Sequence, residues 1–99
     1  MCRYLLTKKA VLDLTEIWNY TVDTWSESQA DKYYDELLNF CLTLAENPEN
    51  GRNYTELIPN LMGAKINRHI IFYRKISDNF IEVERVLHEQ MDLKTRLEK

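Results

Sequence analysis

The sequence predicts an α+β domain in which an antiparallel helical hairpin packs on a mostly antiparallel sheet of about four strands. Two observations lead to this fold class. Apolar residues recur every three or four positions through residues 7–46, as they do in amphipathic helices. After Pro59 the period changes to the alternation that is typical of strands. We expect one domain, residues 1–99, because a chain of 99 residues supports one hydrophobic core.

The first half is predicted to hold a short strand and the first helix. Residues 3–6, RYLL, read as an extended start, and Thr7 can cap the helix that follows. The apolar stripe of this helix is expected to contain Val11, Leu14, Trp18, Thr21 and Trp25, widened by Ala10 and Ile17.

The second helix is predicted to start at SESQ, residues 26–29, which has the form of a capping box with Ser26 as the cap. It should end at Asn47, because the residue before a proline avoids helical geometry. So short a connection predicts an antiparallel hairpin. The apolar stripe of the second helix is expected to be Ala30, Tyr33, Tyr34, Leu37, Leu38, Cys41, Leu44 and Ala45.

The second half is predicted to form a loop, three strands and a short final helix. The loop-rich segment 47–60 contains YTELI, which could form a short extended piece. The strands are expected in LMGAKIN, HIIFYRKI and FIEVERVLH, with a tight hairpin between the last two. The helix is expected in EQMDLKTRLEK. The N-terminal strand should join the sheet beside one of these strands, although the sequence does not show which one.

Composition and charge exclude several classes of protein. A content of 44% hydrophobic and 29% charged residues is that of a globular domain. No apolar run is long enough to span a bilayer, and Asp13 and Glu16 interrupt the apolar N-terminal segment, so we expect a cytoplasmic protein without a membrane partner. The net charge of −3 disfavours general nucleic-acid binding, and no sequence-specific nucleic-acid contact is expected.

The charge is nevertheless uneven, because residues 1–61 carry 5 basic and 10 acidic side chains and residues 62–99 carry 8 and 6. A local basic strip on the C-terminal half therefore stays possible. The sequence contains no metal-ligand spacing, glycine-rich phosphate loop or nucleophile elbow. We therefore predict no metal, no cofactor and no catalytic residue. Cys41 is expected to be a buried free thiol.

Two arginines interrupt rows that are otherwise apolar. Regular alternation places Arg85 beside Ile81, Val83 and Leu87, and Arg74 beside Ile70, Phe72 and Ile76. Such an arginine needs a carboxylate, a carbonyl or a ligand. We favour a structural partner, such as Glu56 or backbone carbonyls, because structural ion pairs are common.

The stretch RVLHEQMD, residues 85–92, also raises the possibility of RNA cleavage by Arg85 and His88. Alternation places these two side chains on opposite faces, and the neighbouring glutamates would repel an RNA backbone. His88 is therefore interpreted as a histidine at the end of a sheet. The aromatic stripe is mainly expected in the core, but so small a domain should leave some aromatic surface exposed for a protein interface.

Together these motifs resemble the ParE toxins of type II toxin–antitoxin systems, in the RelE/ParE superfamily. The resemblance covers almost the whole chain. The motifs that carry it are Tyr4-Leu5-Leu6-Thr7, Ala10, Asp13-Leu14, Glu16-Ile17-Trp18, Tyr20, Gln29-Ala30, Tyr33, Asn47-Pro48, Gly51, the segment from His69 to Arg74, the segment from Ile81 to His88, and Met91-Asp92.

The resemblance implies a toxin that inhibits DNA gyrase, stabilises its complex with cleaved DNA and is neutralised by a ParD-like antitoxin. It implies an inhibitor rather than an enzyme. The RelE branch has the same fold but cleaves mRNA on the ribosome, and it uses basic residues with a C-terminal tyrosine that this chain lacks. The alternatives are a RelE-like ribonuclease that uses Arg74, Arg85 and His88, and an inactive antitoxin-binding module.

The candidate site residues follow from these hypotheses. The candidates for binding the target are Arg68, Arg74 and Arg85, and those for binding the antitoxin are Trp18, Trp25 and Tyr33. The antitoxin is expected on the exposed side of the helical hairpin and along a free sheet edge, where a disordered tail can fold on binding.

Overall fold

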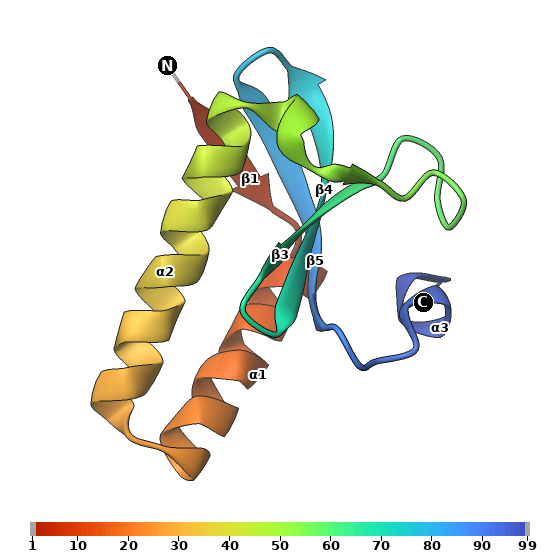
Figure 1. Cartoon of the computed structure of the whole chain (residues 1–99). Helices are drawn as coiled ribbons and strands as arrows, with labels where there is room; N and C mark the ends of the chain where they lie inside the picture. Colours follow the sequence, from red (N-terminus) through yellow and green to blue (C-terminus); the bar gives the residue numbers. More distant parts are fainter. Residues whose placement is uncertain (1, 99) are drawn as a thin grey trace.

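The computed structural model describes residues 2–98 and confirms the α+β fold class (Figure 1). The chain forms two long helices, a mixed sheet and a short C-terminal helix. In order, the elements are β1 (Arg3–Leu6), α1 (Lys8–Thr24), α2 (Glu27–Glu46), a 3₁₀ turn (Pro48–Asn50), β2 (Arg52–Asn53), β3 (Met62–Ile66), β4 (His69–Ser77), β5 (Phe80–His88) and α3 (Leu93–Glu98). None of the helices within residues 2–98 is long and apolar enough to cross a membrane.

The sheet has five strands in the order β1-β5-β4-β3-β2. β1 lies parallel to β5, with Arg3 opposite Phe80, and the other neighbouring pairs are antiparallel. The fifth strand, β2, has only two residues and precedes YTELI. An extended YTELI was a wrong prediction, because Leu57 and Ile58 both donate their backbone N–H groups to the carbonyl of Tyr54 and form a turn.

Side-chain caps fix where the two long helices begin. The Thr7 hydroxyl oxygen accepts the N–H of Ala10 at 3.1 Å, and the Ser26 hydroxyl oxygen accepts that of Gln29 at 3.0 Å. Each bond satisfies an N–H group that has no partner within the helix. The α2 helix ends at Glu46, immediately before Asn47-Pro48, as predicted.

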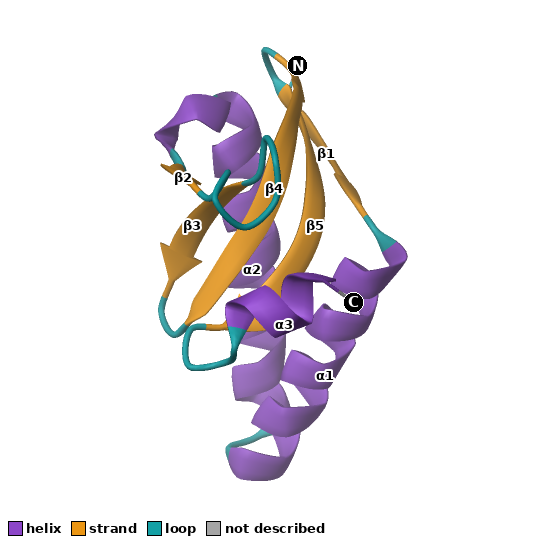
Figure 2. Cartoon of the chain, turned by 90° about the vertical axis from the view of Figure 1, so that its right-hand side faces the viewer, coloured by secondary structure: helices purple, strands orange, loops and turns teal. Residues whose placement is uncertain are grey.

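The two faces of the sheet have separate apolar clusters. The helical hairpin covers one face, and α2 lies behind the sheet in Figure 2. The other face, here called the open face, is partly covered by α3 and by the segment 54–61 (Figure 2). The main cluster includes Leu14, Leu37, Cys41, Ile71, Tyr73, Ile81 and Val83, and the open-face cluster contains Leu61, Ile70, Phe72 and Leu87 with Leu93 and Leu97 packed against it.

The predicted stripe of α2 is confirmed, whereas that of α1 was partly wrong. The buried residues of α1 are Ala10, Asp13, Leu14 and Thr21. Val11 and Trp25 lie outside this face and are 47% and 75% exposed. The helix has this rotation because the Asp13 side chain accepts a hydrogen bond from the backbone of Val86 at the edge of β5, as described below. Cys41 is a buried free thiol, and burial raises its pKa to about 12.

A β-bulge breaks the alternation of β5. Phe72 pairs with Arg85 and Tyr73 pairs with Val83, so Glu84 is an extra residue in β5. The predicted row of Ile81, Val83, Arg85 and Leu87 was therefore wrong: Ile81 and Val83 face the helices, while Leu87 belongs to the open face. The bulge shifts every later side chain to the opposite face from the one that regular alternation assigns.

Candidate functional site

A wide groove of about 1350 Å³ runs beside the helical hairpin. One wall is the outer surface of α1, and the other consists of the β3–β4 turn, the end of β5 and the segment that leads to α3. Its lining includes Leu12, Ile17, Tyr20, Trp25, Tyr33, Arg68, His69, Arg85, His88, Met91 and Arg96.

The α1 wall exposes large apolar side chains. Leu12 is 62% exposed, Tyr20 67% and Trp25 75%. Exposed aromatic surface was expected from the sequence, and the structure places it along one helix. Apolar side chains gathered on a concave surface are typical of sites that bind another protein.

The floor of the groove contains a histidine pair and a tyrosine. His69 and His88 are opposite each other in β4 and β5, with ring centroids 5.4 Å apart. The Tyr33 hydroxyl, from α2, lies 2.8 Å from His69 Nδ1. Burial, with a smaller contribution from His88, lowers the pKa of His69, and burial raises the pKa of Tyr33. This contact attaches the helical hairpin to the end of the sheet.

At the junction of α1, β5 and α3, all three nitrogen atoms of the Arg85 guanidinium donate hydrogen bonds. Its Nε donates to Asp13 Oδ2 at 2.8 Å, its Nη2 to Asp13 Oδ1 at 3.0 Å and its Nη1 to the carbonyl oxygen of Arg96 at 2.9 Å. Asp13 Oδ2 also accepts the backbone N–H of Val86 at 3.0 Å. The bond to Asp13 raises the pKa of Arg85. A structural partner was correctly expected, but Glu56 was the wrong one.

Asp13 becomes the partner because β1 ends at Leu6. Beyond this point no strand within residues 2–98 covers the edge of β5, and α1 passes there instead. The Asp13 carboxylate therefore replaces the missing strand for Val86. Glu56 lies in the exposed turn after β2 and contributes nothing to this network.

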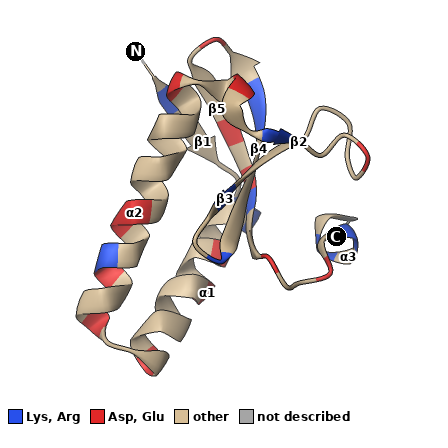
Figure 3. Ribbon diagram, in the orientation of Figure 1, with Lys and Arg blue, Asp and Glu red and all other residues tan. Residues whose placement is uncertain are grey.

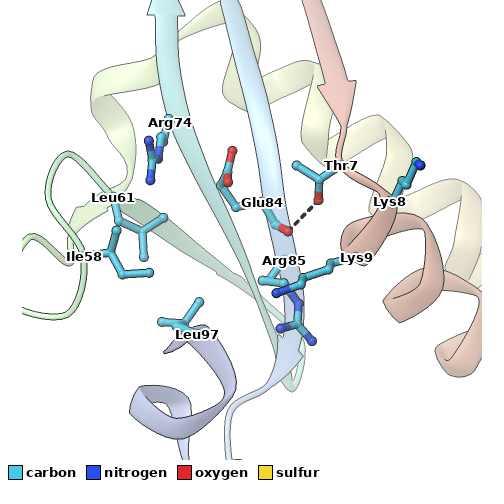
Figure 4. Close-up of a pocket in the computed structure, with 9 residues that line it drawn as sticks. All are labelled: Thr7, Lys8, Lys9, Ile58, Leu61, Arg74, Glu84, Arg85 and Leu97. Atoms are coloured by element: carbon cyan, nitrogen blue, oxygen red, sulfur yellow. Dashed lines mark hydrogen bonds between the residues drawn. The ribbon is translucent and has the colours of Figure 1, made fainter. Parts of the chain in front are cut away.

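A second hollow, of about 360 Å³, lies on the open face (Figure 4). Arg74 and Glu84 lie on adjacent strands at its upper end, and Thr7, Lys8 and Lys9 bring the start of α1 to one side. Ile58, Leu61 and Leu97 form an aliphatic wall on the other side. The Thr7 hydroxyl donates to the backbone carbonyl of Glu84 at 2.8 Å.

The predicted site residues divide between these two places. Trp25, Tyr33, Arg68 and Arg85 line the groove, while Arg74 and Arg85 line the open-face hollow. Trp18 lines neither, because its ring is half-buried between the two helices and its Nε1 donates to Asp31 Oδ1 at 3.0 Å.

Sequence reasoning missed Leu12, Tyr20 and Asp13 as parts of the groove. Leu12 and Tyr20 are eight residues apart and so share one helix face, which was a signal in the sequence. Asp13 was interpreted as a break in an apolar run and as part of the motif Asp13-Leu14, but not as a residue of the groove. Within residues 2–98 no group of three or more histidine, cysteine, aspartate or glutamate side chains could hold a metal ion.

Comparison with known proteins assigns the family. The family model described as the ParE toxin of the type II toxin–antitoxin system parDE matches residues 4–93. The chain belongs to this family of ParE toxins. Its relatives in the family include Toxin ParE1 of Mycobacterium tuberculosis, which is 39% identical over 95 residues, covering 96% of this chain and 97% of that toxin.

Other members of the ParE family are similar over comparable lengths. Toxin ParE of Escherichia coli is 34% identical over 97 residues, covering 98% of this chain and 94% of that protein. A solved structure of the chromosomal ParDE system from P. aeruginosa is similar in fold, with a TM-score of 0.75 at 18% identity, and the match covers 89% of this chain and 96% of that one. The resemblance noted in the sequence motifs is thus confirmed at the level of the family and the fold.

Proposed function

We propose that this ParE-family toxin acts in the cytoplasm by binding DNA gyrase, so that cleaved DNA accumulates, and that it has no catalytic site of its own. The structure supports this proposal because Arg85 and His88, two of the three side chains that the ribonuclease alternative would use, are engaged elsewhere, whereas Arg74 is not. The Arg85 guanidinium is bound by Asp13 and the Arg96 carbonyl, and His88 Nδ1 accepts the N–H of Gln90 at 3.1 Å. Arg85 and His88 also lie on opposite faces, since they pair with Phe72 and His69 respectively.

The groove beside α1 is the proposed site of a ParD-like antitoxin. The observation that carries this assignment is the row of exposed Leu12, Tyr20 and Trp25 above a floor that contains Tyr33. A helix with one apolar face would cover this row. An extended tail could add to the outer edge of β3, which β2 covers only at Met62 and Gly63.

The candidates for contacting the target are revised by exposure. Arg68 and Arg74 are exposed and remain proposed contacts with gyrase. Arg85 has a side chain that is only 15% exposed and is bonded on three sides, so we assign it to positioning α1 and α3 rather than to direct contact. In Figure 3 the segments with Lys and Arg are interspersed with segments that carry Asp and Glu rather than gathered in one part of the ribbon.

The test is a supercoiling assay with purified gyrase and plasmid DNA. We expect loss of supercoiling and accumulation of cleaved plasmid as the toxin is added, and recovery when a cognate ParD-like antitoxin is present. Normal supercoiling at toxin in large excess over gyrase contradicts the proposal. Ribosome-dependent mRNA cleavage that is lost in an Arg85 or His88 variant with an unchanged circular dichroism spectrum would instead establish the ribonuclease alternative.

Two variants separate the antitoxin site from the target site. Trp25→Ala should weaken antitoxin binding at least about tenfold, because exposed aromatic residues at the centre of an interface carry much of the binding energy. It should leave gyrase inhibition intact. Lys32→Ala, on the exposed surface of α2 outside the groove, is the matched control. Equal antitoxin affinity for both variants contradicts the placement, and unimpaired growth on expression without antitoxin would favour an inactive binding module.

A further inference from the structure

The open-face hollow is chemically divided into an aliphatic side and a charged side. Ile58, Leu61 and Leu97 form the aliphatic side (Figure 4). Lys8, Lys9, Arg74, Glu84 and Arg85 form the charged side. A volume of about 360 Å³ is near the lower limit for a ligand site and corresponds to one or two side chains rather than to a helix.

Arg74 differs from Arg85 in lacking a partner. Both arginines occupy sheet positions next to apolar residues, but the Arg85 side chain is only 15% exposed, whereas Arg74 is exposed. Arg85 has Asp13 and a backbone carbonyl as partners, whereas the Arg74 side chain makes no hydrogen bond or ion pair with any residue in the described part of the chain. Arg74 exerts a longer-range attraction on Glu84. The planar donor group of Arg74 is therefore open to a carboxylate from outside.

Glu84 supplies a second unsatisfied group at the same place. Glu84 is the extra residue of the bulge and lines the hollow together with Arg74, whose partner across the strands is Glu82. The Oε2 atom of Glu84 is buried without a hydrogen-bond partner in the described structure. Burial, together with the neighbouring Glu82 carboxyl, raises the pKa of Glu84 to about 7. In its protonated form Glu84 can donate a hydrogen bond to an acceptor that is bound by Arg74.

We propose that the open-face hollow binds a segment of a partner protein that presents one carboxylate beside an aliphatic side chain. Arg74 binds the carboxylate, and the wall of Ile58, Leu61 and Leu97 takes the aliphatic part. This surface lies on the opposite side of the sheet from the helical hairpin and shares only Lys9 and Arg85 with the groove. The proposal goes beyond the assignment of gyrase, because it specifies the chemistry that any partner must offer here.

The charges favour a protein segment over a nucleic acid. A chain of phosphates would have to pass the Glu84 carboxylate, and the far side of the hollow consists of aliphatic residues instead of further cations. A single carboxylate meets Arg74 and the positive potential of Lys8 and Lys9, and Glu84 is the one acidic side chain that lines the hollow beside it. Neutralising Glu84 removes the remaining repulsion, so binding should tighten as the pH falls through the pKa of Glu84, which is about 7.

The experiment is an NMR titration of the full chain, observing the Nε–Hε signals of the arginines and the methyl groups of Ile58 and Leu97. The probe is an acetylated, amidated tetrapeptide of alternating leucine and glutamate. The matched probe has glutamine in place of glutamate, and a short oligouridylate tests the nucleic-acid alternative. We expect the acidic peptide to shift Arg74 and the two methyl groups together and to bind at least about tenfold more tightly than the glutamine peptide.

Three variants complete the test. Arg74→Gln should weaken binding at least about tenfold, whereas Lys32→Gln, the same charge change on α2, should not. Glu84→Gln should bind above pH 7 as tightly as the unmodified protein binds below it, because the amide cannot ionise. Both Arg74 and Lys32 are exposed, so neither change should alter the fold.

The proposal is overturned if the acidic peptide leaves the Arg74 signal unmoved, if the two peptides bind equally, or if Arg74→Gln binds as well as the unmodified protein. Displacement of the Arg74 signal by oligouridylate alone also overturns it. None of these results would affect the gyrase proposal, whose supercoiling assay does not depend on this peptide.

Discussion

Replacing Asp13 by asparagine should strongly destabilise the protein. The Asp13 carboxylate accepts three hydrogen bonds, two from Arg85 and one from the backbone of Val86, and the two side chains are only 9% and 15% exposed. An asparagine keeps one acceptor oxygen and turns an NH₂ group toward N–H donors. It also leaves the Arg85 charge without its counter-ion in a largely dry site.

The magnitude follows from these contacts. Breaking one partner of a buried ion pair costs about 3–5 kcal/mol, and the residual exposure here reduces this to about 2–4 kcal/mol. For a domain of this size, each kcal/mol lowers the melting temperature by roughly 4–8 °C, so the expected decrease is roughly 10–30 °C. A double-mutant cycle of Asp13→Asn with Arg85→Gln should give a coupling energy of about 1–3 kcal/mol.

Thermal and urea unfolding followed by circular dichroism measure the effect. The control is Glu49→Gln, which removes the partner of Lys75 in an exposed ion pair whose side chains are 70% and 39% accessible. The control should lower the stability far less than Asp13→Asn does, because solvent screens an exposed ion pair. If Asp13→Asn costs no more than Glu49→Gln, the Asp13–Arg85 pair does not hold α1 on the sheet and the reasoning is refuted.

Three further predictions concern Glu84, His69 and Gly51. Folding raises the pKa of Glu84 from 4.5 to about 7, so the proton stabilises the folded form and the stability falls as the pH rises between these values. In urea unfolding, Glu84→Gln should therefore raise the free energy of unfolding by about 1–3 kcal/mol above pH 7 and change it little below pH 4.5. A lack of pH dependence in the difference contradicts this. Burial lowers the pKa of His69 in the folded state below 6.5, so the stabilisation that the neutral His69 contributes is complete above pH 6.5 and is lost as the pH falls through the pKa of the folded state. His69→Gln should therefore flatten the dependence of the free energy of unfolding on pH in this range. An unchanged dependence excludes His69 as its source. Gly51→Ala should destabilise, because a Cβ atom there would meet the Tyr73 hydroxyl, which donates to the Pro48 carbonyl at 2.7 Å, and an unchanged melting temperature would show that Tyr73 can move.

Features that depend on neighbouring residues in the chain could be predicted from the sequence. Thr7 and Ser26 cap helices because each hydroxyl reaches an N–H group three residues ahead, and the hairpin between β4 and β5 follows from turn residues at Asp78 and Asn79. The alternation in β4 likewise placed Ile70, Phe72 and Arg74 together.

Features that depend on distant residues could not be predicted in this way. The bulge at Glu84 exists only in the pairing of β5 with β4, so regular alternation assigned Leu87 to the wrong face. The partner of Arg85 is 72 residues away in sequence, and nothing near Arg85 identifies it. The groove also depends on tertiary structure, because the rotation of α1 that exposes Trp25 is set by the contact of Asp13 with the edge of β5.

The pairing of β1 with β5 also has a consequence during synthesis. Arg3–Leu6 pairs with Phe80–Val83, so the first strand waits for about 77 further residues to be made before its partner exists. At roughly 5–20 residues per second this delay is roughly 4–15 s. Sheets closed by such remote contacts form late, because the loop between the strands must be ordered first. A chain that ends before Phe80 therefore lacks the strand with which β1 pairs, and it cannot close this sheet.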